Sequence, residues 1–93
     1  MKRWLGLFSS TMKIFPNPTS GRLFADLSAW KGGQVSVRIY NSRGQRVLEL
    51  PVPAEEELQI VDLPQGLAGG LYFFEVVTAD GEKRGARFVF MAN

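Results

Sequence analysis

Apolar and polar residues alternate along most of the chain, in short segments that are separated by turn-forming residues. In residues 34–40, for example, Val35, Val37 and Ile39 alternate with more polar neighbours. A period of two is typical of a strand that buries one of its faces. The predicted strands are residues 12–15, 22–27, 34–40, 45–50, 57–63, 71–78 and 84–91.

Turn residues predict two hairpins between these strands. Residues 41–44 read Asn-Ser-Arg-Gly, in which Asn favours the first turn position and Gly supplies the left-handed backbone of a bulged loop. Asp80-Gly81 gives the same signal before the last strand. Pro51 and Pro53 lack the N–H that a β-ladder needs, so the strand that starts at Gln45 is expected to end before them.

These patterns together predict an all-β fold. The strands are short, only residues 26–31 could form a helical turn, and no amphipathic helix lies between the strands. Residues 71–78 are the most apolar strand and are therefore expected near the centre of a sheet. The sequence predicts a seven-stranded antiparallel β-sandwich of immunoglobulin-like type.

Length and composition limit what such a fold can do. The chain has 93 residues, which fits one domain, and 45% of them are hydrophobic. We expect residues 12–93 to form this domain and residues 1–11 to be a linker remnant or N-terminal extension, because the apolar run 4–8 is too short for a signal peptide or a membrane span. The chain contains no Cys and no His, so it offers no thiolate ligand, disulfide or histidine base.

Charge is unevenly distributed, but not in the manner of a nucleic-acid-binding protein. Residues 1–46 hold eight of the eleven Lys and Arg residues, whereas eight of the nine acidic residues lie in residues 47–93. The basic residues fall mostly at predicted strand ends and turns rather than among aromatic residues on one face. No nucleic-acid partner is expected.

Candidate catalytic and metal-binding groups have simpler interpretations. Residues 55–57 are three consecutive Glu, which point to different sides of an extended connector and are expected to be solvated. Asp26, Asp62, Asp80 and Asn17 could supply oxygen ligands to calcium, but turn formation also explains them. We expect no catalytic residue, no metal site and no cofactor.

Residues 15–21, Phe-Pro-Asn-Pro-Thr-Ser-Gly, form the most unusual segment. Its two prolines fix two φ angles and favour extended conformations at the residues before them. Thr19 and Ser20 can bond to the local backbone, and Gly21 relieves the turn before the next strand. The segment is expected to form a corner between the first two strands.

Three segments together resemble the type A C-terminal sorting domain of type IX secretion. They are residues 14–21 with the Pro-Asn-Pro motif, the hairpin at residues 37–47, and residues 67–73 with the later 80–81 and 87–89. The resemblance covers about residues 12–90. The residues that carry it are Pro16, Asn17, Pro18, Gly21, Tyr40, Asn41, Gly44, Gln45, Gly70, Tyr72, Arg87, Phe88 and Val89.

The resemblance implies a non-catalytic export signal. It implies that an outer-membrane translocon of Gram-negative bacteria reads the domain, and that a surface sortase removes it from a cargo protein, which is absent from this chain. The expected location is secreted or cell-surface, reached through the periplasm, for a monomer without a membrane span. We expect residues 71–78 and 84–91, with Arg87, to present the surface that is read.

A different function is compatible with the same fold. A β-sandwich that binds carbohydrate or mediates surface adhesion would need an exposed aromatic platform around Trp4, Trp30 or Tyr40. Fold alone does not distinguish this from a sorting signal or a structural spacer.

Overall fold

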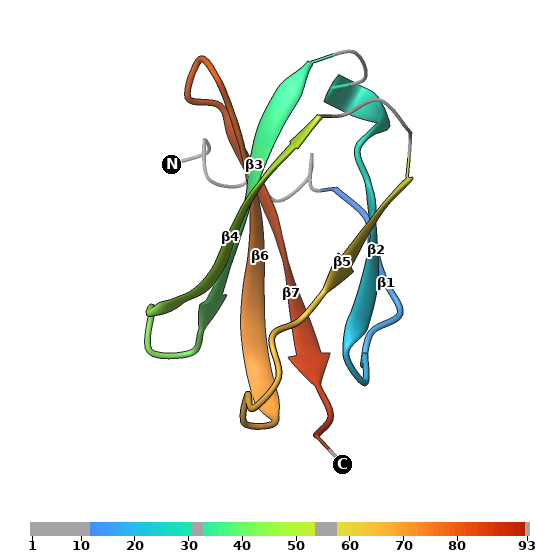
Figure 1. The fold of residues 1–93 in the computed structure, drawn as a ribbon, viewed down its shortest axis with the longest axis vertical. Helices are drawn as coiled ribbons and strands as arrows, with labels where there is room; N and C mark the ends of the chain where they lie inside the picture. Colours follow the sequence, from blue (N-terminus) through green and yellow to red (C-terminus); the bar gives the residue numbers. More distant parts are fainter. Residues whose placement is uncertain (1–11, 31–32, 54–57, 93) are drawn as a thin grey trace, which may run out of the picture.

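Two β-sheets pack face to face in the computed structural model, which describes residues 12–30, 33–53 and 58–92 (Figure 1). One sheet has three strands in the order β1-β2-β5, and the other has four in the order β4-β3-β6-β7. All strand pairs within the sheets are antiparallel, which confirms the predicted immunoglobulin-like sandwich. The elements are β1 (Ile14–Phe15), β2 (Arg22–Asp26), the 3-10 turn η1 (Ser28–Trp30), β3 (Gln34–Asn41), β4 (Arg46–Pro53), β5 (Leu58–Asp62), β6 (Gly70–Thr78) and β7 (Lys83–Phe90).

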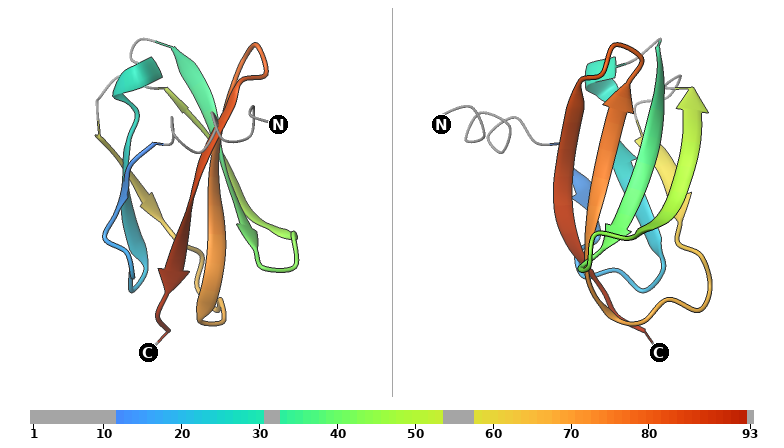
Figure 2. Two further views of the ribbon diagram at one scale, coloured as in Figure 1. Left: turned by 180° about the vertical axis from the view of Figure 1, so that it is seen from behind. Right: turned by 90° about the vertical axis from the view of Figure 1, so that its left-hand side faces the viewer.

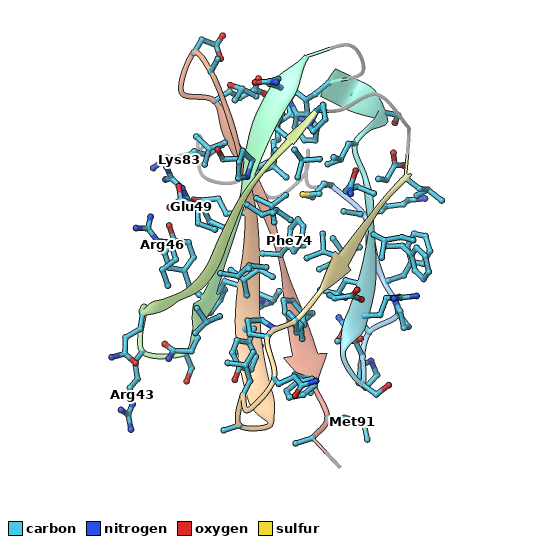
Figure 3. The ribbon with its side chains drawn as sticks, in the orientation of Figure 1. Arg43, Arg46, Glu49, Phe74, Lys83 and Met91 are labelled. Atoms are coloured by element: carbon cyan, nitrogen blue, oxygen red, sulfur yellow. The ribbon has the colours of Figure 1, made fainter. Side chains whose placement is uncertain are left out.

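The core lies between the sheets and follows the alternation seen in the sequence. In β3 the inward residues Val35, Val37 and Ile39 are buried, as predicted. Phe74 of β6 is only 1% exposed and lies between the two sheets in Figure 3. A buried aromatic of this kind typically contributes about 3–5 kcal/mol when measured by replacement with Ala. Burial therefore fixes the register of each strand, since a shift by one residue would turn its apolar side to water.

The four-stranded sheet places the last two strands next to one another (Figure 2). β6 pairs with β3 on one side and with β7 on the other, so it occupies the inner position that its apolar sequence predicted. β7 is an edge strand of this sheet, so no other strand of the sheet pairs with its outer edge.

The expected end of β4 before its prolines is wrong. β4 continues through Pro51 and Pro53, which pair with Ser36 and Gln34 of β3. Because β4 is the other edge of the sheet, its prolines need no N–H to pair with a strand on the outer side. Prolines and charges on an edge also discourage pairing with other chains.

The predicted hairpins and helical turn are present. Gly44 and Gly81 have φ angles of +85° and +93°, as the left-handed position of each bulged loop requires. The helical turn η1 lies within the predicted residues 26–31. In the described part of the chain, no helix has the length and apolar character needed to cross a membrane. The proposed N-terminal extension, residues 1–11, lies outside the described residues.

Candidate recognition site on the C-terminal strand

The Asn17 side chain forms hydrogen bonds with the backbone at the outer edge of β7, as a neighbouring strand would. Its Oδ1 accepts a hydrogen bond from the Val89 backbone N–H at 3.0 Å, and its Nδ2 donates to the Arg87 carbonyl at 3.3 Å. A carboxamide has the same donor and acceptor pair as a peptide group, so it can continue a β-ladder for one step. The Pro-Asn-Pro motif and the Arg87 to Val89 motif thus meet directly.

Thr19 extends the same contact by one more step. Its backbone N–H donates to the Val89 carbonyl at 2.9 Å, and its carbonyl accepts from the Met91 N–H at 2.8 Å. The bridge between Thr19 and Phe90 is parallel. The Thr19 hydroxyl is satisfied locally, since it donates to the Arg22 carbonyl and accepts from the Gly21 N–H. Residues 17–19 therefore pair with the last residues of β7 and hold them against the sandwich.

The corner between β1 and β2 contains both prolines and a glycine with a positive φ. Pro16 and Pro18 are both exposed and flank Asn17, and the peptide bonds that precede them are cis. Gly21 has a φ of +144°, a conformation that residues with side chains rarely adopt. The corner was predicted from the sequence, whereas its contact with β7 was not.

Two other motif residues build the interior beneath this corner. Tyr72 is 4% exposed and Phe88 is 1% exposed, and their rings stack with centroids 5.7 Å apart. The Tyr72 hydroxyl donates to the Ala68 carbonyl in the loop before β6. Gly70, with a φ of +145°, lets that loop turn into β6. The side chains of Tyr72 and Phe88 therefore stabilise the fold and are not accessible to a partner.

The hairpin motif is held together by its own side chains. Asn41 Oδ1 accepts the N–H groups of Arg43 and Gln45, and Asn41 Nδ2 donates to Gln45 Oε1 at 2.9 Å. The Tyr40 hydroxyl donates to Glu75 Oε1 on β6 at 3.3 Å. The side chains of this motif therefore hold the loop between β3 and β4 and join β3 to β6.

The outward side of β6 and β7 carries the accessible motif residues. Arg87 and Val89 are exposed, and they pair across the sheet with Phe73 and Leu71. Leu71, Phe73 and Val89 are 40%, 37% and 40% exposed, and Met91, two residues further on, is 56% exposed. We call these five residues (Leu71, Phe73, Arg87, Val89 and Met91) the C-terminal patch. Figure 3 places Met91 just before the end of the chain.

The aspartates considered as calcium ligands are engaged separately. A hydrogen bond from the Ser28 N–H lowers the pKa of Asp26, and one from the Arg22 guanidinium lowers that of Asp62. A hydrogen bond from the Thr78 hydroxyl lowers the pKa of Asp80. No cluster of three or more potential metal ligands occurs in the described residues, and the glutamates at 55–57 lie outside them.

The aromatic residues considered for carbohydrate binding do not form a platform among the described residues. Trp30 is half-buried against the core, and the Arg84 guanidinium lies 5.6 Å from its ring centroid. Tyr40 is half-buried near the C-terminal end of β3, on the outer side of the four-stranded sheet. Trp4 lies outside the described residues. The guanidinium over the Trp30 ring occupies a face on which a sugar would otherwise stack.

The sequence identified the Pro-Asn-Pro corner and the last strand as separate segments but did not predict that they meet. Asn17 and Val89 are separated by 72 residues, and no local pattern reports a contact over that distance. One chemical feature pointed to such a contact. Asn17 lies between two prolines, outside any predicted strand, so its polar amide needs hydrogen-bond partners from elsewhere in the chain.

Comparison with known proteins identifies the family. Among curated proteins, no sequence matches the chain significantly. Among solved structures, the chain is similar to CopC from Methylosinus trichosporium OB3b, with 22% identity and a TM-score of 0.47, over 91% of this chain and 87% of that one. The family model described as "Secretion system C-terminal sorting domain" matches residues 13–89. The chain therefore belongs to the C-terminal sorting domain family of the type IX secretion system.

Proposed function

We propose that this domain is a non-catalytic export signal, read by the outer-membrane translocon of the type IX system. The observation that carries the proposal is the family match, which spans nearly all of the described residues. In this proposal an attached cargo is delivered through the periplasm to the cell surface or the medium. A surface sortase then cleaves the domain from the cargo and anchors the cargo.

The position of β7 at the edge of its sheet supports a reading surface on this strand. β7 is an edge strand, and its last residues are held by Asn17 and Thr19 rather than left unpaired. This arrangement presents Arg87 and Val89 on a fixed strand, so a partner meets them without the entropy cost of ordering a free tail. A monomer suffices for this role, since β7 and the segment that holds it, residues 17–19, belong to one chain.

A reporter fusion tests the proposal. Residues 12–93 would be fused behind a periplasmic reporter in a cell that carries the type IX system and in an isogenic cell without the translocon. We expect export only in the first cell, and an Arg87→Glu variant tests whether the exposed end of β7 is read. Retention of the wild-type fusion in the competent cell would contradict the proposed function.

Deletion of residues 88–93 is a poor test of recognition, because it also removes the buried Phe88. Loss of a core aromatic of this size typically costs about 3–5 kcal/mol, a large part of the roughly 5–15 kcal/mol that stabilises a typical domain. Point substitutions at exposed positions separate reading from folding.

A further inference from the structure

The exposed large apolar residues of the described chain are not scattered over its surface. Seven of the eight lie in two groups on opposite outer faces of the sandwich. Leu71, Phe73, Val89 and Met91 belong to the C-terminal patch, and Phe15, Leu58 and Ile60 lie on the outer face of the three-stranded sheet. The eighth is Leu50, on the edge strand β4. Grouped apolar residues on a surface commonly mark an interaction site.

The two outer faces differ in charge. The strands of the three-stranded sheet carry one arginine and two aspartates, and Arg22 is paired with Asp62 at 2.7 Å. The outer side of the four-stranded sheet instead carries four cations and two carboxylates. These are Arg38, Arg46, Lys83 and Arg87, with Glu49 and Glu75.

The cations on the four-stranded sheet are not equally neutralised. Arg38 and Arg46 both pair with Glu49, at 3.3 and 3.4 Å. Within the described residues, no ion pair joins Lys83 or Arg87 to a carboxylate. Figure 3 shows Lys83, Arg46 and Glu49 on the outer side of this sheet. The unneutralised positive charge of this sheet therefore lies on β7, at Arg87 within the C-terminal patch and at Lys83 near the start of the strand.

We propose that the C-terminal patch docks on an apolar protein surface that bears carboxylates next to its apolar centre. This inference rests on the proposed function and names the chemistry of the partner. Leu71 and Val89 face each other across β6 and β7 and form the apolar centre, with Phe73 beside them. Arg87 lies opposite Phe73, so a partner carboxylate that pairs with Arg87 must border the surface that covers the phenyl ring. Apolar contact supplies the affinity, and the charge supplies orientation and encounter rate.

Binding to outer-membrane vesicles tests this pairing of apolar and acidic chemistry. The fluorescently labelled domain would be titrated with vesicles from type IX-competent cells and from isogenic cells that lack the translocon. We expect saturable binding to the first kind alone, weakened by rising salt and abolished by protease treatment of the vesicles. The double variant Leu71→Ser/Val89→Ser should bind the vesicles at least tenfold more weakly than wild type. Arg87→Glu should weaken binding by a similar factor, whereas Arg87→Lys should retain most of the wild-type affinity.

Matched controls come from the same chain. Ile60→Ser removes an equally exposed apolar residue (47%) from the other face, and should bind within about twofold of wild type. Arg43→Glu makes the same change in net charge as Arg87→Glu, but on the hairpin between β3 and β4, well away from Met91 in Figure 3. It should also stay within twofold. Equal chemical denaturation midpoints establish that each variant is folded.

Several results would overturn the inference. These are undiminished binding of the double variant, equal losses for Ile60→Ser or Arg43→Glu, or binding to translocon-free or protease-treated vesicles. A reporter assay run in parallel separates this inference from the proposed function. If the wild-type fusion is exported and the patch variants are exported equally well, the inference is wrong and the proposed function stands. If the wild-type fusion is retained, the proposed function fails and this inference fails with it.

Discussion

Replacing Asn17 with Ala should loosen the end of β7 and lower the stability of the whole domain. The substitution removes the two hydrogen bonds that join the side chain to the backbone of Val89 and Arg87. A typical hydrogen bond contributes a net 0.5–1.5 kcal/mol, so the expected loss is about 1–3 kcal/mol. Since the site is exposed and water can replace the carboxamide, we expect the lower half of this range, about 1–2 kcal/mol. For a domain of this size the melting temperature should fall by roughly 4–16 °C.

The assay combines denaturant unfolding with hydrogen exchange at the Val89 amide. Asn17→Ala should lower the unfolding midpoint and accelerate exchange of the Val89 N–H, because its acceptor is lost. Asn41→Ala is the matched control: it removes comparable hydrogen bonds in the β3–β4 hairpin, which lies away from β7. It should destabilise the domain without a selective effect at Val89. Unchanged stability and unchanged Val89 exchange in Asn17→Ala would refute the role given to this side chain.

Three further variants test other parts of the structure. Gly44→Ala should cost about 1–2 kcal/mol, because its φ of +85° strains any residue with a Cβ, and denaturant unfolding measures this directly. NMR titration should show that the pKa of the Asp62 carboxyl lies below its ordinary value, and that Arg22→Gln raises this pKa. Because the pKa is lowered in the folded state, the ion pair stabilises the fold above the unfolded-state pKa of about 3.9. This stabilisation is lost as the pH falls through the folded-state pKa. Replacing both Pro51 and Pro53 with Val should leave the monomer folded but make the β4 edge self-associate, which light scattering would detect as concentration-dependent mass; a strictly monomeric variant would contradict the protective role of the prolines.

The parts of the fold that the sequence predicted are those governed by local alternation and local turns. The inward residues of β3 and β6 could be identified because a half-buried strand repeats every two residues. The two bulged hairpins could be identified because a left-handed position selects Gly. In both cases the physical cause lies within a few residues of its effect, so one segment is sufficient to predict it.

The parts that escaped prediction depend on where a strand lies in its sheet. Pro51 and Pro53 stop a central strand but not an edge strand, and the sequence of β4 does not say which one it is. In the same way, Asn17 could be seen as part of a stiff corner, whereas its carboxamide pairs with a strand from the other end of the chain. Both outcomes are set by tertiary arrangement rather than by local preference.

The family motif combines residues that build the fold with residues that a partner can touch. Tyr72 and Phe88 are buried, Asn17 pairs with β7, and only Arg87 and Val89 combine exposure with a place on the C-terminal patch. Similarity to the family at Tyr72, Phe88 and Asn17 therefore indicates that the sandwich fold is formed, and says little about the partner that binds it. Loss of export on mutation of a motif residue has two physical causes, unfolding and lost contact, which a stability measurement on the same variant separates. In the proposed function, residues that distinguish one translocon from another are expected at Leu71, Phe73 and their exposed neighbours, while packing constrains the buried motif residues.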